Sequence, residues 1–567
     1  MKKQTTLLAL LFGCLHLFGQ ETAIRNVNVI EVKTGKQLPN YSVLIANEKI
    51  SWVGPDKKLR IGEQTKIIDG TGKYLIPGLV DAHIHFFQSG SLYTRPDAVD
   101  FTNRLPYSTE RDNGFNNTTD YFKRYLRLGI TTVIDVGGPF NNFVIRDSIR
   151  KTTPSPSVLV TGPLFSIVED KELELNDPPI IKVASTDDVD QLFARMLPKK
   201  PDFIKLWYIV DKEHPADKSY PLVQHLATLC AKNNLKLAVH ATELETAKLA
   251  VHAGATILVH SVDDAVIPDD FAKTLKDKNV TYIPTLLVMG NYYKTFSGRL
   301  THHPQDLKWA NAFAYGTLTD IESMDSTSLP SVIRWYRKHG IPKTPADSIM
   351  SVNLAKLQKA GVNIATGTDA GNIGTFHASS YLQELEAMRK AGLSNAEILK
   401  SSTINATSCF GLADKVGSID NGKHADLLLL TKNPLESLQN LNSVELIFKN
   451  GKPIKADTLI RESPEEIVQR QVNAYNARNL DAFLDTYSDD IEIYQDGKLV
   501  MKGREQMRKD YDFLNKVPNL YCEIKNRMVI NNKVIDQEKV RFGKQFIHGV
   551  AIYETANGKI KKVTFIE

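Results

Sequence analysis

The chain has 567 residues, which is too long for one hydrophobic core and suggests roughly three or four domains. Hydrophobic residues make up 42% of the chain and charged residues 24%, a composition that excludes a mainly disordered protein. The 70 basic and 65 acidic side chains give a formal net charge of +5 and are interspersed without long runs of one sign, which argues against a nucleic-acid partner.

The first twenty residues have the pattern of a secretory signal peptide. Lys2 and Lys3 precede an apolar run that ends near Phe18, and this run is shorter than the roughly 20 apolar residues that a membrane span needs. We therefore expect residues 1–20 to be removed on export, which leaves a periplasmic protein without a transmembrane segment in its mature chain. A lipoprotein-like pattern ends at Cys14, so a lipid anchor on Cys14 is the alternative.

Short alternating strands and turns follow, up to residue 75, and a similar pattern returns after residue 412. Neither stretch is large enough to bury its own apolar face. We therefore predict that residues 21–75 and 413–457 form one small, discontinuous β-sandwich domain.

Between these two stretches, apolar strands alternate with amphipathic helices. The predicted strands are 78–83, 131–136, 157–162, 203–207, 235–241, 257–261, 281–286 and 362–367. Alternating strands and helices of this kind predict an α/β fold, a (β/α)₈ TIM-like barrel over residues 76–412. A polar, aromatic-rich insertion from Gly290 to Ala346 precedes the last strand, and we expect it to lie over the mouth of the barrel.

The last hundred residues form another pattern. After a boundary near residues 457–463, a helix-rich stretch is followed by several strands. We predict a separate α+β domain over residues 463–567.

The strongest chemical signal is a pair of histidines at the end of the first barrel strand. His83 and His85 are two residues apart, and side chains two apart on a strand share a face, so both can reach one metal ion. An isolated pair of this kind also occurs by chance in loops, so its interpretation depends on the rest of the chain.

Three more polar residues stand at the carboxyl ends of later strands. His240 closes the fifth predicted strand, His260 closes the sixth, and Asp369 follows the eighth. Barrel enzymes place their chemistry at this end of the strands. Imidazole and carboxylate groups gathered there predict a cation site of the zinc type.

Lys205 lies within the apolar fourth strand. An ammonium ion cannot bind a metal, and burying it beside cations costs free energy. The lysine can pair with a carboxylate, or it can lose its proton and capture carbon dioxide as a carbamate. Formal charges come out equal for one cation with the ammonium and two cations with the carbamate, so charge alone leaves this open.

Taken together, these residues resemble the amidohydrolase superfamily, and in particular its prolidase-like and imidazolonepropionase-like branch. The resemblance runs from about Ala23 to Pro453 and rests on the histidine pair after Ile76-Pro77-Gly78-Leu79-Val80, the lysine strand, the two later histidines and Thr368-Asp369-Ala370-Gly371. It implies a metal-dependent hydrolase of C–N bonds.

The resemblance also implies a ligand set. His83, His85 and Asp369 would hold one zinc ion, His240 and His260 a second, and a carboxylated Lys205 would bridge them. Other divalent metals remain alternatives to zinc. The candidate catalytic residues are Asp369, His260 and Glu243.

Two departures from the family pattern bear on the substrate. Ile134 stands where the branch often has arginine, and His240 and Glu243 have the spacing of mononuclear deaminases, in which the glutamate shuttles protons. The alternatives are therefore a mononuclear deaminase or imidazolone-type hydrolase that uses Glu243, a lactone or ester hydrolase, and a non-catalytic binding protein.

The expected mechanism follows from metal chemistry. Zinc lowers the pKa of its water to about 7, so that a hydroxide can attack the scissile carbonyl at neutral pH. Asp369 would accept the proton and return it to the leaving nitrogen. Tyr208 and His302 are candidates to assist the carbonyl oxygen, and the resemblance suggests that His377 contacts the substrate.

The C-terminal segment resembles the nuclear-transport-factor-two-like (SnoaL-like) fold. The resemblance rests on motifs such as Tyr475-Asn476-Ala477-Arg478-Asn479-Leu480-Asp481-Ala482-Phe483 and Gly503-Arg504-Glu505. It implies a cone-shaped α+β domain used for small-molecule binding, isomerisation or dimerisation. The expected partners are thus a small-molecule substrate and a second copy of the chain that associates through this domain, and no nucleic acid.

Overall fold

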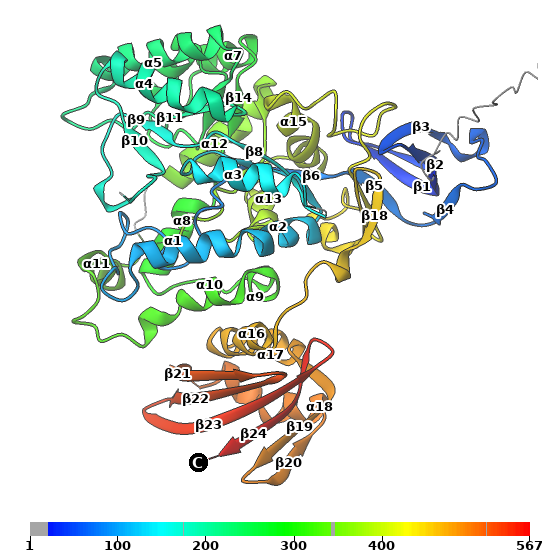
Figure 1. Ribbon diagram of the computed structural model, residues 1–567, viewed down its shortest axis with the longest axis vertical. Helices are drawn as coiled ribbons and strands as arrows, with labels where there is room; N and C mark the ends of the chain where they lie inside the picture. The colour runs from blue at the N-terminus through cyan, green and yellow to red at the C-terminus, as the bar shows by residue number, and fades with distance from the viewer. Residues whose placement is uncertain (1–20, 153, 174, 342–345, 518, 567) are drawn as a thin grey trace, which may run out of the picture.

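The computed structural model describes residues 21–152, 154–173, 175–341, 346–517 and 519–566, so the predicted signal peptide lies outside the described residues. The chain forms a barrel, a small β-domain against one side of the barrel and a sheet-rich C-terminal domain (Figure 1). Within the described part of the chain, no helix is long and apolar enough to cross a membrane.

The barrel contains eight parallel strands, as predicted. They are β6 (Leu79–Ile84), β7 (Ile130–Asp135), β8 (Ser157–Val160), β11 (Ile204–Trp207), β12 (Leu237–His240), β13 (Ile257–Val259), β14 (Thr281–Ile283) and β15 (Asn363–Ile364). The short strands β9 (Leu164–Ser166) and β10 (Ile180–Lys182) extend the sheet beside β11.

Backbone hydrogen bonds outside the regular ladders close the barrel. The Asp202 N–H donates to the Val160 carbonyl at 3.0 Å, which links β8 to the start of β11. The Ala82 N–H donates to the Thr366 carbonyl at 2.8 Å, which links β6 to the segment after β15. The predicted (β/α)₈ fold class is therefore confirmed, although the eighth strand is regular over only two residues.

Apolar side chains explain why these strands lie inside. Residues such as Val80, Ile134, Phe203 and Ile257 fill the interior of the barrel, and alternate residues pack outward against the helices. The helices around the barrel are α1 (Tyr107–Asn116), α2 (Thr118–Arg127), α3 (Asn141–Ile149), α4 (Thr186–Met196), α5 (Ala216–Lys232), α6 (Leu244–Ala253), α7 (Asp269–Asp277), α12 (Ala346–Ala360), α13 (Tyr381–Lys390), α14 (Asn395–Lys400) and α15 (Ala406–Cys409).

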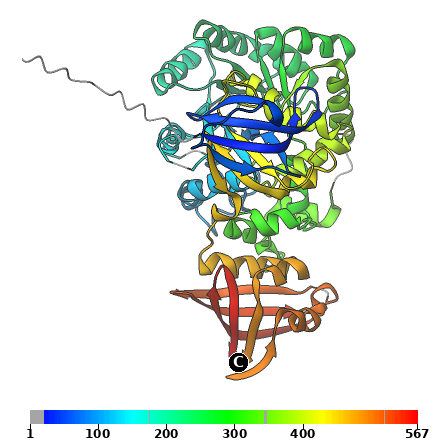
Figure 2. The same cartoon turned by 90° about the vertical axis from the view of Figure 1, so that its right-hand side faces the viewer.

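The small domain is built from the two stretches of chain that precede and follow the barrel in the sequence. Its strands are β1 (Thr22–Glu31), β2 (Lys36–Ala46), β3 (Lys49–Pro55), β4 (Lys66–Asp69), β5 (Tyr74–Pro77), β16 (Leu427–Leu430), β17 (Val444–Lys449) and β18 (Lys452–Lys455). Antiparallel pairing of β5 with β16 joins the two stretches into one sheet. Figure 2, which looks onto this domain, shows its strands in front of the barrel.

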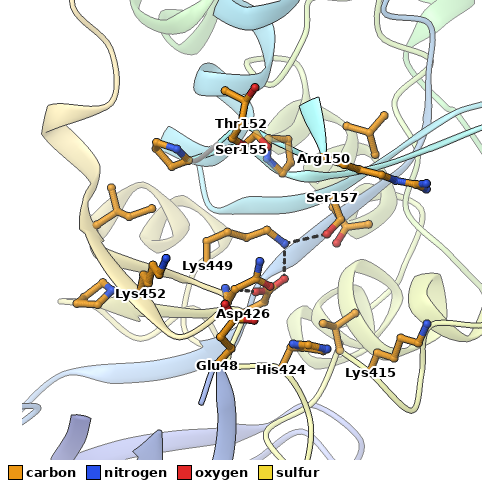
Figure 3. Close-up of a pocket in the computed structure, with 18 of the residues that line it drawn as sticks. Glu48, Arg150, Thr152, Ser155, Ser157, Lys415, His424, Asp426, Lys449 and Lys452 are labelled. Carbon is orange, nitrogen blue, oxygen red and sulfur yellow. Dashed lines mark hydrogen bonds and ion pairs between the residues drawn. The ribbon is translucent and has the colours of Figure 1, made fainter. Parts of the chain in front are cut away.

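A buried lysine of the small domain, Lys449, contacts the barrel (Figure 3). Lys449 donates to Asp426 at 2.6 Å and to the Ser157 hydroxyl, at the start of β8, at 2.9 Å. A cavity of about 750 Å³ lies beside this pair. Because Ser157 begins its strand, this cavity is at the amino-terminal end of the barrel strands, opposite the end that bears the predicted metal ligands.

The described residues of the predicted insertion form four α-helices, the middle two of which lie between the barrel and the C-terminal domain (Figure 1). These helices are α8 (Val288–Phe296), α9 (Pro304–Trp309), α10 (Ala312–Thr317) and α11 (Ser331–His339). The C-terminal domain contains α16 (Pro464–Asn476), α17 (Leu480–Asp485) and α18 (Arg504–Asp510) with a six-stranded sheet of β19 (Tyr487–Gln495), β20 (Lys498–Lys502), β21 (Tyr521–Ile530), β22 (Lys533–Phe542), β23 (Gln545–Ala556) and β24 (Lys559–Ile566).

Helix α16 attaches the C-terminal domain to the insertion. Asn473 donates to the Ala312 carbonyl at 2.7 Å, and Arg470 donates to the Leu307 carbonyl at 2.7 Å. Apolar side chains of the insertion and of the C-terminal domain belong to one continuous buried cluster. The C-terminal domain therefore has its own sheet, as predicted, but it shares a hydrophobic core with the helices over the barrel.

Candidate metal centre

His83 and His85 meet Asp369 at the carboxyl ends of β6 and β15. The Nε2 atoms of both histidines lie 3.2 Å from Oδ1 of Asp369. One ligand atom from each of the three residues lies within 4.8 Å of the others, so a single ion can contact all three. His83 is fully buried, which keeps competing water away from its ring.

A second pair of imidazoles adjoins the first. The ring centroids of His240 and His260 are 4.4 Å apart, and the His260 ring lies 4.8 Å from that of His83. His240 is the last residue of β12 and His260 immediately follows β13. The structure therefore brings all four histidines and Asp369 to one end of the barrel.

Lys205 lies in β11 and is 1% exposed. Burial lowers its pKa to about 7, against a smaller opposite effect of the Asp369 carboxylate. A substantial fraction of the amine is then neutral near neutral pH, which is the form that can react with carbon dioxide. Its charge also influences the pKa values of His83 and His240, as expected for neighbours of one cluster.

The backbone at the ligand positions is unusual. His260 and Asp369 have φ values of 71° and 60°, in the left-handed region that residues other than glycine rarely adopt. The Asp369 N–H donates to the His83 carbonyl at 2.8 Å, and Nδ1 of His260 lies 2.8 Å from the Thr285 hydroxyl. These bonds fix the backbone of Asp369 and the ring of His260 at the end of the barrel.

The charge states of these side chains fit a cation. Burial lowers the pKa of His83 to about 4 and that of His240 to about 3, so both imidazoles are neutral at pH 7 and offer lone pairs. Burial alone would raise the pKa of Asp369, but His83, His85 and His260 hold it well below its usual range. Asp369 is therefore ionised.

Unpartnered nitrogen atoms point to a missing partner at this site. Both ring nitrogens of His83 and Nδ1 of His240 are buried without a hydrogen bond. Buried polar atoms are normally satisfied, and an ion bound by Nε2 of His83, which lies 3.2 Å from the Asp369 carboxylate, would give that nitrogen a partner. His85 Nδ1 lies 2.7 Å from the Gly137 carbonyl, which fixes its tautomer and directs the lone pair of Nε2 toward the cluster.

Three residues that the sequence pattern missed hold Asp369 in place. The side-chain amide of Asn372 donates to Oδ1 of Asp369 at 2.8 Å. The carbonyl oxygen of the same amide accepts from Arg95 at 2.7 Å and from the Tyr292 hydroxyl at 2.8 Å. Because both partners are donors, the orientation of the Asn372 amide is determined.

A cavity of about 340 Å³ opens beside the cluster. Its lining includes the candidate ligands His85, His240, His260 and Asp369 together with Trp207, Tyr292, Tyr293, Phe296, Val288, Met289, Met350 and Ile209. Trp207 was detectable from sequence, because it is two residues from Lys205 on the same strand and therefore shares its face.

The remaining predicted site residues lie elsewhere. The Tyr208 hydroxyl donates to the Ala216 carbonyl on α5, and His302 contacts the Tyr315 hydroxyl within the insertion. His377 is buried between the Gln88 carbonyl and Tyr125. The Glu243 carboxylate accepts from Thr246 on its own helix, at 3.2 Å. None of these four predicted residues is among those that line the cavity beside the metal cluster.

Comparisons with known proteins match both large parts of the chain. A model of the "Amidohydrolase family" matches residues 74–454, and one of the "SnoaL-like domain" matches residues 468–563. A putative prolidase from Bifidobacterium longum is 22% identical, with a TM-score of 0.57 over 78% of this chain and 98% of that chain. The A. niger ochratoxinase is 19% identical, with a TM-score of 0.58 over 77% and 96%.

Curated relatives give shorter or more distant matches. Guanine deaminase from Escherichia coli (strain K12) is 24% identical over 72% of this chain and 85% of its own length. Adenine deaminase from Ruegeria pomeroyi is 46% identical, but over only 13% of each protein. At these identities the solved structures show a shared fold, and the substrates named for these relatives do not transfer to this chain.

Proposed function

The chain belongs to the amidohydrolase family, and from this premise we propose that it is a metal-dependent hydrolase that cleaves a C–N bond of a small substrate at a binuclear site. The observation that supports this proposal most directly is the convergence of His83, His85 and Asp369 within 4.8 Å, with His240 and His260 beside them. The nitrogen and oxygen donors of this cluster suit zinc.

Six residues would hold the metal. His83, His85 and Asp369 would bind one ion and His240 and His260 a second, with a carboxylated Lys205 between them. A bound divalent ion supplies Lewis acidity, which polarises the scissile carbonyl and makes water nucleophilic near neutral pH. Carboxylation of Lys205 is consistent with its burial and with the lowering of its pKa to about 7.

Asp369 is the catalytic base of the proposal. Its Oδ1 is held by Asn372, and Oδ2 lies 3.9 Å from His260 Nδ1 on the opposite side of the carboxylate. As water attacks the carbonyl carbon, Asp369 takes a proton from it. The same proton then passes to the leaving nitrogen, so that the C–N bond breaks and the products are a carboxylic acid and an amine.

Lys205→Ala tests the binuclear arrangement. We expect about two zinc ions per wild-type chain and about one or fewer in the variant, because removal of a bridging ligand leaves two cations facing each other. Hydrolysis should be almost abolished, and added short carboxylic acids should restore part of it. Metal content is measured by plasma mass spectrometry, with the exposed Lys232→Ala as the matched control.

Glu243→Gln distinguishes the deaminase alternative. In the proposed arrangement Glu243 does not reach the cavity, so this variant should keep its metal and most of its activity. One tightly bound ion in both wild type and Lys205→Ala, with activity lost only in Glu243→Gln, would contradict the binuclear proposal and favour a mononuclear deaminase.

A further inference from the structure

The cavity beside the metal cluster is mostly apolar. Trp207, Tyr292, Tyr293 and Phe296 provide ring surfaces, and aliphatic side chains from α8 and α12 complete the wall. A cavity of about 340 Å³ with this lining favours a substrate that carries an apolar group of the size of a ring.

Arg95 is the only lysine or arginine among the described residues that line this cavity. Its positive charge is neutralised by a carboxylate of the protein, Asp97. Arg95 forms a two-pronged ion pair with Asp97 and donates to Asn372, and its guanidinium lies 5.9 Å from the centre of the Trp207 ring. A substrate carboxylate would therefore enter an apolar cavity without finding an unpaired protein cation.

Asp263 places an acidic group on the same wall. It lines the cavity and is partly buried. Burial raises the pKa of Asp263, and the nearby carboxylates of Glu243 and Asp264 raise it further. Of these three carboxylates only Asp263 lines the cavity, where it repels a substrate anion and attracts an amino group.

We infer that the substrate is a carboxamide with an apolar, ring-sized group and no free carboxylate, and that an amino group near Asp263 improves binding. This inference rests on the proposed function, since it names the substrate class of the same site. The physical reason is the free energy required to bury an unpaired carboxylate in an apolar wall, which an uncharged group does not incur.

Three matched anilides test the inference. They are the 4-nitroanilides of phenylacetic acid with a methyl, an aminomethyl or a carboxylate group in the para position, so they differ in charge and hardly in size. We expect kcat/KM for the carboxylate compound to be at least about tenfold below that for the methyl compound, and the aminomethyl compound to be the best of the three. Release of 4-nitroaniline is followed by absorbance.

Binding to the full-length, metal-loaded protein is measured separately, by calorimetry for a compound that is not hydrolysed and from KM for one that is. Binding in the expected order without release of 4-nitroaniline would contradict the proposed hydrolysis and leave the specificity intact. Hydrolysis of the carboxylate compound as fast as the methyl compound would overturn the specificity and leave hydrolysis intact. If none of the three compounds binds or reacts, the inferred substrate class is wrong.

Two variants trace the specificity to individual residues. Asp263→Asn should remove the preference for the aminomethyl compound, whereas the exposed Glu245→Gln, with the same change of charge, should leave it unchanged. Asp97→Asn frees the guanidinium of Arg95 and should raise the ratio of carboxylate to methyl hydrolysis by about tenfold. An unchanged aminomethyl preference in Asp263→Asn together with an unchanged ratio of carboxylate to methyl hydrolysis in Asp97→Asn would show that these charges do not select the substrate.

Discussion

Asn372 is the polar residue next to Asp369 that the strand pattern does not identify. It comes from the turn after the ligand, and its amide joins Oδ1 of Asp369 to Arg95 and Tyr292, which come from the segment after β6 and from α8. A group that forms a hydrogen bond to a metal-binding side chain usually affects both the orientation and the basicity of that side chain. We therefore propose Asn372 as a positioning residue for Asp369.

Asn372→Ala should lower kcat by about 10–100-fold with a much smaller change in KM, because Asp369 then loses its hydrogen bond and its fixed orientation. Tyr292→Phe removes only one of the two donors to Asn372 and should have a smaller effect. Metal content and steady-state kinetics are measured together. A variant that keeps the wild-type kcat would contradict the positioning role.

The segment after β15 shows how the last barrel strand closes without a regular ladder. The Asp81 carboxylate accepts from the Thr368 N–H at 3.0 Å and from its hydroxyl at 2.7 Å, so a side chain replaces strand pairing there. Gly367 lies at the closest approach, where a Cβ would stand 2.6 Å from Ile283 Cγ2 and 2.7 Å from the Cβ of His83. The absence of a side chain at Gly367 thus sets the position of His83.

Gly367→Ala should lower the free energy of unfolding by about 1–3 kcal/mol and reduce bound metal, because the new methyl group displaces His83 or Ile283. Gly290→Ala is the matched control, since a Cβ on this residue of α8 meets no atom within 4 Å. Denaturant unfolding and metal analysis of both variants provide the measurement. Equal stability and metal content in the two variants would show that the close approach is not limiting.

At the scale of the whole molecule, the C-terminal domain stabilises the helices over the barrel. α8 contributes to the lining of the cavity, and its residues Val288, Tyr292 and Phe296 belong to the same apolar cluster as side chains from the C-terminal domain. α16 adds hydrogen bonds from Arg470 and Asn473 to carbonyls of the insertion. Helix α8 and the C-terminal domain thus belong to one packed apolar cluster.

A chain that ends at Thr458 should still bind metal, because all six proposed ligands precede that residue. Its melting temperature should fall by about 5–10 °C, since several apolar side chains of the insertion become exposed. Catalytic efficiency should fall as well, because α8 loses part of its support. Calorimetry and binding of a hydrophobic dye measure this. A shortened chain as stable as the full-length protein would show that the shared core contributes little.

The sequence by itself determined the barrel and the six candidate ligands. Runs of apolar residues mark each strand. Three of the candidate ligands lie within strands (His83, Lys205 and His240), and three follow the carboxyl ends of strands (His85, His260 and Asp369). Parallel barrel strands all direct these ends to one side, so the convergence of the ligands follows from local pattern and chain direction alone. Adjacent side chains of a strand point to opposite faces, so Trp207 lines the cavity while its neighbour Tyr208 contacts α5.

Only the tertiary structure decided which residues surround that cluster. Arg95 and Tyr292 are almost two hundred residues apart in the chain and meet at Asn372 because the segment after β6 and helix α8 pack against the turn after Asp369. His302 and His377 are satisfied by local partners, and no sequence pattern distinguishes a histidine of this kind from one that faces a substrate. The sharing of a core between the insertion and the C-terminal domain has the same cause, because it depends on long-range packing of apolar surfaces rather than on local periodicity.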